Sequence, residues 1–375
     1  MYLDNAATTM LQPEVAEIVR KYGYDSYYNP SALYGAAVSV NREIASMRAD
    51  FAKSLGVSPD TIYYTSCGSE SDNAALLSSR LARGARVIIS AAEHSAVYRA
   101  AQALAERGME VVQCPVDSYG RVDAAAFVGL LDSRTALVSI MHVNNETGAV
   151  NDIKRLVEVT KLQDKRILFH SDGVQAVGHL NVNLRALGVD MYSISGHKFG
   201  APKGVGALYV KKGVSIAPFV YGGGQESGLR SGTENVIGVA SMTKCLENYL
   251  AANDELVAKG AELRLRADAF AASHEGVMVL SPEDGAPHIV TLAFAKVRGE
   301  VMMHVLEEAD IIVGIGSACS SKKGTARIPK ALGLRDGYEM GMLRLSINPF
   351  DTYDWDYLFD KMHEAYVRLC KYVRV

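Results

Sequence analysis

The sequence lacks the features that mark membrane, nucleic-acid-binding and disulfide-rich proteins. It has no run of about 18 apolar residues, and its first residues do not form a signal peptide, so we expect a cytoplasmic protein that does not contact a membrane. A net charge of −3 gives no electrostatic reason to expect binding to nucleic acid. The five cysteines are scattered and form no CxxC pair, which argues against a disulfide framework or a zinc site, and we predict no metal.

With 375 residues, the chain is longer than a typical single domain, so we expect one large and one smaller domain. Up to about residue 245, apolar strand-like runs alternate with helical patterns. Such runs occur at 61–65, 86–90, 109–116, 135–143, 166–172, 189–194 and 206–210. The alternation predicts an α/β fold with a mostly parallel sheet that helices cover on both faces. From about residue 246, strands and helices mix, which indicates a smaller α+β domain.

The stretch 189–206, VDMYSISGHKFGAPKGVG, carries a lysine that is well placed for covalent chemistry. A β-leaning run ends in Ser195-Gly196-His197-Lys198 and then opens into a turn rich in glycine and proline. Strand ends of this kind lie at the sheet edge where open α/β proteins bind ligands. Partial burial would lower the pKa of the Lys198 amine and make it nucleophilic. Alone, a lysine here is more often a solvated loop residue, so its role depends on its partners.

A second stretch has the pattern of a phosphate site. The apolar run 61–65 is followed by Ser66-Cys67-Gly68-Ser69-Glu70 and then by a helical pattern. Gly68 would let the backbone approach a ligand, Ser69 supplies a hydroxyl, and the free N–H groups of a first helical turn favour an anion. Ser69 also fits a plain helix N-cap. The stretch lacks the GxxxxGK[ST] pattern, so it is not a nucleotide P-loop.

Polar side chains recur where the predicted strands end. They are Ser69, His94, Asn145, Asp172, Gln175, Ser195, His197 and Lys198. Together they suit an aromatic cofactor with a phosphate group, which needs a helix N-terminus, a lysine, an aspartate for a protonated ring nitrogen and a flat side chain over the ring. This combination predicts pyridoxal phosphate. A dinucleotide site in GGGQESG is disfavoured because this segment does not follow the first strand of the sheet.

The sequence resembles the class V aminotransferase family of fold-type I pyridoxal-phosphate enzymes, and within it the NifS-like cysteine desulfurases. The resemblance covers essentially the whole chain. It rests, in order, on YLDNAATT, NPS, TSCGSES, EHSAV, HVNNETGAV, HSDGVQAVG, SISGHKFGAPKGVGALYV, GGGQESGLRSGTEN and GSACSS. It implies a large cofactor-binding domain at 15–245 with a sheet of the seven-stranded type. It also implies a small domain, made of 1–14 and 246–375, that carries the Cys319 loop.

The resemblance further implies a set of residues around pyridoxal phosphate. Lys198 would be the Schiff-base lysine, and His94 would stack on the ring and assist proton transfer. Asp172 and Gln175 would bind the ring nitrogen and the ring hydroxyl, respectively, and Asn145 would lie near that hydroxyl and the substrate. The residues expected at the phosphate are Gly68, Ser69, Ser195 and His197, with Thr233 reaching the phosphate of the other subunit. The last role implies a homodimer.

For the substrate, the resemblance implies that Arg344 binds the carboxylate of L-cysteine. Cys319 would take the sulfur as a persulfide, release L-alanine and pass the sulfur to an acceptor protein for iron–sulfur cluster, thio-cofactor or tRNA biosynthesis. Two lysines just after Cys319 would favour its thiolate, although a lone cysteine is more often a buried structural thiol. Two alternatives stay open: another class V enzyme, such as a selenocysteine lyase or an aminotransferase, and a weakly active scaffold in a sulfur-transfer complex. Departures at Ala32, at Tyr34 and after Ser346 leave the acceptor and the details of the substrate open.

Overall fold

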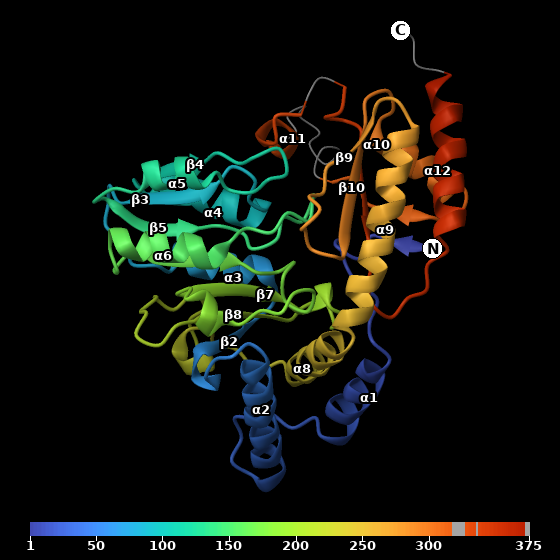
Figure 1. Ribbon diagram of the computed structural model, residues 1–375. Helices are drawn as coiled ribbons and strands as arrows, with labels where there is room; N and C mark the ends of the chain where they lie inside the picture. The colour runs from blue at the N-terminus through green and yellow to red at the C-terminus, as the bar shows by residue number, and fades with distance from the viewer. Residues whose placement is uncertain (317–326, 335–336, 372–375) are drawn as a thin grey trace.

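The computed structural model of the protein describes residues 1–316, 327–334 and 337–371. Its centre is a seven-stranded sheet with the strand order β2-β8-β7-β6-β5-β3-β4 (Figure 1). The strands are β2 (Ile62–Thr65), β3 (Arg86–Ser90), β4 (Glu110–Cys114), β5 (Thr135–Ser139), β6 (Leu168–Asp172), β7 (Met191–Ser195) and β8 (Gly206–Val210). All pairs from β4 through to β7 are parallel, whereas β8 runs antiparallel to both β7 and β2. The predicted mostly parallel α/β sheet is therefore confirmed.

Helices cover both faces of this sheet, and alternate side chains of one strand reach opposite faces. Val87 and Ile89 of β3 pack in one core with α3 and α4, whereas Ile88 packs in the other core with α5 and α6. The helices are α2 (Gly35–Ser54), α3 (Gly68–Leu77), α4 (Ser95–Glu106), α5 (Ala124–Leu130), α6 (Ile153–Gln163), α7 (Leu184–Leu187) and α8 (Val236–Ala251). Because β3 and β8 are buried on both faces, their sequences read as nearly continuous apolar runs, whereas the edge strand β4 is only partly buried.

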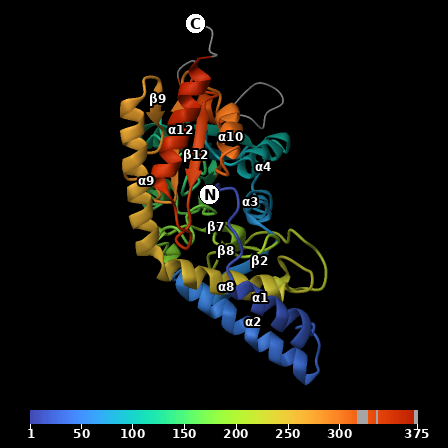
Figure 2. The same ribbon diagram turned by 90° about the vertical axis from the view of Figure 1, so that its right-hand side faces the viewer.

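A second, smaller unit has a core of its own. Its antiparallel sheet has the order β12-β10-β9. Its elements are α9 (Asn253–Ser273), β9 (Val277–Val279), β10 (Ile289–Phe294), α10 (Gly299–Glu307), β11 (Ile312–Val313), α11 (Arg327–Ala331), β12 (Met342–Ser346) and α12 (Trp355–Cys370). The N-terminal strand β1 (Tyr2–Leu3) pairs with β11, and Leu3 is fully buried in this core. Figure 2 shows the N-terminus beside β12.

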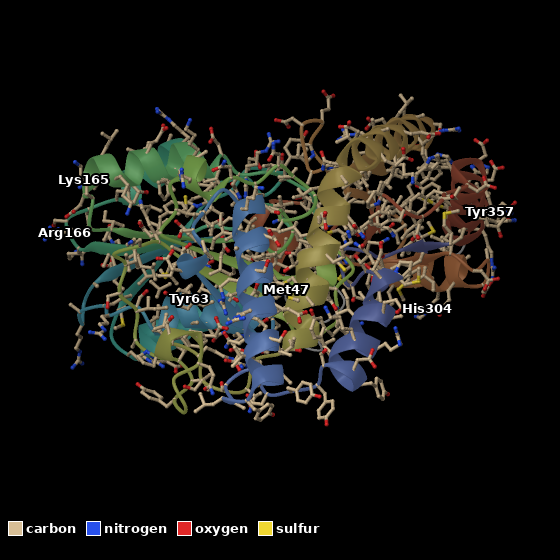
Figure 3. All side chains as sticks on the ribbon, turned by 90° about the horizontal axis from the view of Figure 1, so that it is seen from below. Met47, Tyr63, Lys165, Arg166, His304 and Tyr357 are labelled. Atoms are coloured by element: carbon tan, nitrogen blue, oxygen red, sulfur yellow. The ribbon has the colours of Figure 1, made fainter. Side chains whose placement is uncertain are left out.

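The described residues form two separate main cores, and the division into domains at 15–245 and at 1–14 with 246–375 stays a prediction. Helix α8 crosses the proposed boundary, and Cys245 and Leu246 both pack in the core of the large sheet. Seen from below, the two units lie at opposite ends of the molecule, with Lys165 and Arg166 on the large unit and His304 and Tyr357 on the small one (Figure 3). No helix in the described ranges is long and apolar enough to cross a membrane.

Candidate active site

A pocket of about 310 Å³ lies where the carboxyl ends of β6 and β7 meet the smaller unit. Ten of the residues predicted from the sequence line it. They are Gly68, Ser69, His94, Asn145, Asp172, Gln175, Ser195, His197, Lys198 and Arg344. Thr233 is exposed and does not line this pocket, and Cys319 lies outside the described residues. The folded chain thus gathers residues that are up to 276 positions apart, from Gly68 to Arg344.

Lys198 lies directly after β7, at the end of the short helix Gly196–Lys198. Its Nζ donates hydrogen bonds to the main-chain oxygens of Ala6, at 2.7 Å, and Ala7, at 2.9 Å. Burial, with the nearby Arg344 guanidinium, lowers the pKa of Lys198 to about 8. A lysine without a carboxylate partner at hydrogen-bond distance, held in a pocket wall, has the properties of a nucleophilic amine.

The opposite wall of the pocket is acidic. Asp172 ends β6, is 5% exposed and accepts a hydrogen bond from the Val174 N–H at 2.9 Å. Burial raises the pKa of Asp172, and the nearby His94 and Lys198 oppose that shift. His94 is the N-cap of α4, where its Nδ1 accepts a hydrogen bond from the Ala96 N–H at 3.2 Å. A ring nitrogen of His94 and one carboxylate oxygen each of Asp172 and Asp72 lie within 4.8 Å of one another.

One end of the pocket offers donors for an anion. Helix α3 begins there at Gly68, and a Cβ on Gly68 would lie 2.5 Å from Val174 Cγ2, so only glycine fits. The N-cap of α3 is Cys67, and Ser69 lies in the first turn, so Ser69 is not the cap. The hydroxyl of Ser195 is buried and has no hydrogen-bond partner among the described residues. His197 Nδ1 lies 3.2 Å from Thr8 Oγ1, and burial lowers the pKa of His197 to about 4.

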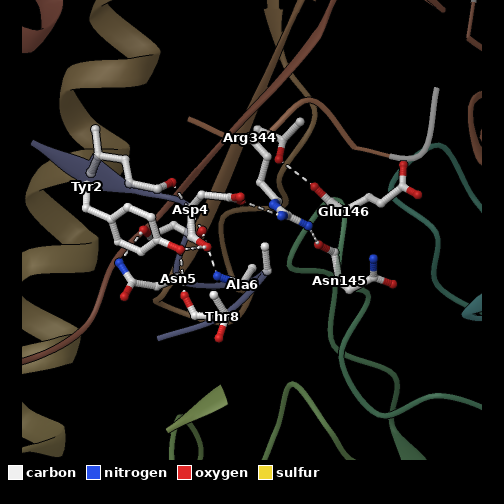
Figure 4. Close-up of polar contacts among 12 residues, drawn as sticks. Tyr2, Asp4, Asn5, Ala6, Thr8, Asn145, Glu146 and Arg344 are labelled. Atoms are coloured by element: carbon white, nitrogen blue, oxygen red, sulfur yellow. Dashed lines mark hydrogen bonds and ion pairs between the residues drawn. The ribbon is translucent and has the colours of Figure 1, made fainter. Parts of the chain in front are cut away.

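Arg344 of β12 occupies the other end (Figure 4). Its Nη1 donates to the main-chain oxygen of Asn145 at 2.7 Å, and its Nη2 pairs with Asp4 Oδ1 at 2.7 Å. Its Nε is buried without a partner in the described part of the chain. A Cβ on Gly314 would lie 3.1 Å from this Nε, so the glycine leaves space beside it. The contacts with Asn145 and Asp4 therefore fix the guanidinium in the pocket wall.

Gly314 and Arg327, described residues on either side of segment 317–326, contact residues of the pocket or their neighbours in sequence. Gly314 pairs with Arg344 through main-chain hydrogen bonds of 3.0 and 2.7 Å. Arg327, on the other side, donates to the main-chain oxygens of Ala91, at 2.7 Å, and Glu93. Glu93 immediately precedes His94. Cys319 comes five residues after Gly314 in the sequence and lies outside the described residues.

Sequence reasoning missed several contacts of the site. It gave no role to Asp4, to the oxygens of Ala6 and Ala7, or to Asp72. It also missed His288, whose Nε2 lies 3.2 Å from Gln175 Oε1, while the Gln175 amide donates to Ala6 O at 2.8 Å. Only the motif YLDNAATT signalled the N-terminal segment, and it did so through resemblance alone. The other contacts join segments too distant for a local pattern to reveal.

Comparison with known proteins accords with this geometry. The family model described as aminotransferase class-V matches residues 1–354. Cysteine desulfurase IscS of Dictyoglomus turgidum is 36% identical over 98% of this chain and 95% of its own, and cysteine desulfurase IscS of Methanosarcina thermophila is 36% identical over 94% and 88%. Among solved structures, a NifS-like protein has a TM-score of 0.91 at 33% identity and covers 98% of this chain and 100% of its own. A NifS-like protein from Rickettsia africae has a TM-score of 0.87 at 26% identity, over 98% and 99%.

The chain therefore belongs to the aminotransferase class-V family. The identity to its relatives is spread over nearly the whole length of both chains. Within the family, it belongs to the cysteine desulfurases of the IscS and NifS type, as the resemblance predicted.

Proposed function

We propose that the protein is a pyridoxal-phosphate-dependent cysteine desulfurase. It converts L-cysteine to L-alanine and transfers the sulfur, as a persulfide on Cys319, to an acceptor protein for iron–sulfur cluster, thio-cofactor or tRNA biosynthesis. The observation that carries the proposal is that Lys198, Asp172 and Arg344 converge in one pocket of a chain that belongs to this family. A lysine amine, a buried acid and a carboxylate-binding arginine are the groups that amino-acid chemistry on this cofactor requires.

The pocket fits pyridoxal phosphate on features of the structure itself. The unpartnered Ser195 hydroxyl and the first turn of α3, with Ser69 and His197, suit the phosphate. Thr233 of the partner subunit would complete this set. The buried Asp172 suits a protonated ring nitrogen, the side chain of Gln175 suits the ring hydroxyl, and His94 suits the ring face. When bound, the cofactor withdraws electrons from the α-carbon of an amino acid.

The chain's own residues then have distinct tasks. Arg344 would bind the substrate carboxylate, and Asn145 lies beside it. Lys198 would hold the cofactor and, as the free amine, would accept a proton from the substrate α-carbon at its Nζ, which its pKa of about 8 allows at neutral pH. His94 would assist proton transfer. The Cys319 thiolate would form a bond to the substrate sulfur while the carbon–sulfur bond breaks. The electron pair of that bond stays on the β-carbon, which takes up a proton, so that alanine leaves and Cys319 keeps the sulfur as a persulfide.

We also propose a homodimer. Thr233 is exposed outside its own pocket, which suits a contact with a second subunit. Large apolar side chains are exposed near the N-terminus, within residues 10–34. Another is Tyr221, which lies in the same glycine-rich segment as Thr233. They are Met10, Leu11, Val19, Tyr24, Tyr27, Leu33, Tyr34 and Tyr221.

Turnover of L-cysteine tests the proposed reaction. Alanine and sulfide are quantified, in the presence of a reductant, for the wild type, for Cys319→Ser and for Cys370→Ser, a matched control at the end of α12. We expect Cys319→Ser to lose sulfide release by at least about 100-fold while it still binds the cofactor, and Cys370→Ser to match the wild type. Undiminished sulfide release by Cys319→Ser would favour another class V reaction, such as selenocysteine cleavage or amino transfer.

A further inference from the structure

A second carboxyl group lies in the acidic wall of the pocket, behind Asp172. Asp72 projects from α3, is 1% exposed and lines the pocket. One of its carboxylate oxygens lies within 4.8 Å of a carboxylate oxygen of Asp172 and of a ring nitrogen of His94. Nothing in the proposed reaction uses Asp72, yet an acid in this position acts directly on the charge of Asp172.

A chain of hydrogen bonds lies beside Asp72 in the protein interior. Ser139 Oγ lies 2.8 Å from His170 Nδ1, and His170 Nε2 lies 2.9 Å from Ser193 Oγ. The Ser193 hydroxyl favours the charged form of Asp72, and His170 Nε2 lies 3.7 Å from Asp72 Oδ1. One tautomer satisfies the hydrogen bonds of His170: Ser139 donates to Nδ1, and Nε2–H donates to Ser193. Burial lowers the pKa of His170 to about 3, so this ring is neutral and brings no positive charge to Asp72.

The two aspartates differ in what surrounds their oxygens. Asp172 accepts the Val174 N–H at 2.9 Å and has Lys198 and His94 nearby, which favour a negative charge. For Asp72, burial and the charge of Asp172 raise the pKa more than Ser193 lowers it, and its Oδ1 has no hydrogen-bond partner within the described ranges. Two buried carboxyl groups this close to each other cannot both be ionised without a large energetic cost. The proton therefore belongs on Asp72 and the charge on Asp172.

We propose that Asp72 is a positioning residue that stays protonated behind Asp172, so that the pair carries a single negative charge, on Asp172, where the ring nitrogen binds. The role at the ring nitrogen rests on the proposed function. The protonation of Asp72 does not, because it follows from the chain's own burial and hydrogen bonds.

The remaining ionisable groups near Asp72 agree with this assignment. Burial, followed by the charge of Asp172, raises the pKa of Asp72 well above its ordinary value. Glu93, which follows β3, and Cys67, at the start of α3, raise it further. Glu93 is itself fully buried, and burial raises its pKa to about 8, so it brings little negative charge at neutral pH. On β6, His170 is neutral, and burial lowers the pKa of His94, whereas Lys198 and Arg344 line the pocket as basic groups. His94 and Lys198 both favour the charge on Asp172.

Infrared spectroscopy of the full chain without cofactor tests the protonation directly. At pH 7, we expect the carbonyl stretch of protonated carboxylic acids, with one component lost in Asp72→Asn and another lost in Glu93→Gln. If Asp72→Asn removes carboxylate absorption and leaves the acid bands unchanged, the proposal is wrong. Labelling the wild type with ¹³C-aspartate shifts the Asp72 band, so the test does not depend on a variant that folds. The Glu93 band stays in place in either case. If no acid band at all shifts on labelling, the proposal is overturned.

Cofactor binding and melting test the consequence for Asp172. Because Asp72→Asn keeps a neutral side chain of the same shape, we expect it to bind pyridoxal phosphate within about threefold of the wild type, whereas Asp172→Asn binds at least about tenfold more weakly. Without cofactor, the raised pKa of Asp72 makes the folded wild type lose stability as pH rises. The melting temperature of the wild type should therefore fall relative to that of Asp72→Asn from about pH 5 to pH 8. A tenfold loss of affinity in Asp72→Asn, or a constant gap in melting temperature, would refute the role. If the wild type itself fails to bind pyridoxal phosphate, the proposed function fails, and the infrared and melting results still decide the state of Asp72.

Discussion

The amine of Lys198 should react at a lower pH than an ordinary lysine. Burial and the Arg344 guanidinium lower the pKa of Lys198 from 10.5 to about 8, and the Nζ contacts only the main-chain oxygens of Ala6 and Ala7 at hydrogen-bond distance in the described part of the chain. At pH 7, roughly a tenth of this amine is uncharged, against roughly 0.03% for an amine with the ordinary pKa, a difference of about 300-fold. We expect this difference to appear as selective labelling at neutral pH.

Competitive labelling of the cofactor-free protein with acetic anhydride, read by peptide mass spectrometry across pH, measures this property for each lysine. Lys259 is a matched internal reference, because its Nζ also donates to two main-chain oxygens, at 2.7 and 2.8 Å, but lies 3.1 Å from Glu255. We expect Lys198 to reach half of its full reactivity near pH 8, and Arg344→Gln to raise that midpoint because a neighbouring positive charge is removed. Equal midpoints for Lys198 and Lys259 would refute the reasoning.

Two further predictions concern the substrate and the fold. Arg344→Lys removes the planar edge beside Gly314, so the KM for cysteine should rise by about 10–100-fold, with a smaller change in kcat, in steady-state kinetics; an unchanged KM would place the carboxylate elsewhere. Gly173→Ala would place a Cβ inside the buried Tyr192 ring and should destabilise the fold by about 3 kcal/mol or more, or prevent folding. Gly129→Ala, in α5 with open space around it, should leave the denaturation midpoint unchanged or raise it slightly.

The fold could largely be predicted because its physical cause lies in short stretches of sequence. A strand buried on both faces must be apolar throughout, and β3 and β8 read that way. The order of strands and the antiparallel direction of β8 could not be predicted, because they depend on contacts such as Tyr192 with Tyr209 and Ile62 with Tyr209, which no local pattern encodes. The domain boundary depends in the same way on whether the residues of α8 pack on one core or the other.

The cofactor side of the site could be predicted for a related reason. In a parallel sheet, the residues at the carboxyl ends of the strands meet at one edge. The positions of Asp172 and Lys198 at such strand ends therefore predict that they lie near a shared site. Asp72 gives no such signal, because it sits inside a helix where an acid most often faces solvent. The protonation of Asp72 depends on its burial and on its neighbours Ser193 and the neutral His170, which hydrogen-bond to each other.

The substrate side depends on the N-terminal segment, which explains why sequence reasoning was weakest there. Asp4 holds Arg344, while Ala6 and Ala7 hold Lys198, so two residues 146 positions apart are oriented by one stretch of four residues. The contacts with Lys198 are made by main-chain oxygens, which every amino acid has. No choice of side chain in the sequence could reveal them. The segment therefore links Arg344, proposed to bind the substrate carboxylate, with Lys198, proposed to receive the substrate's proton. Asp4 acts on both, because it pairs with Arg344 and its charge opposes the lowering of the Lys198 pKa.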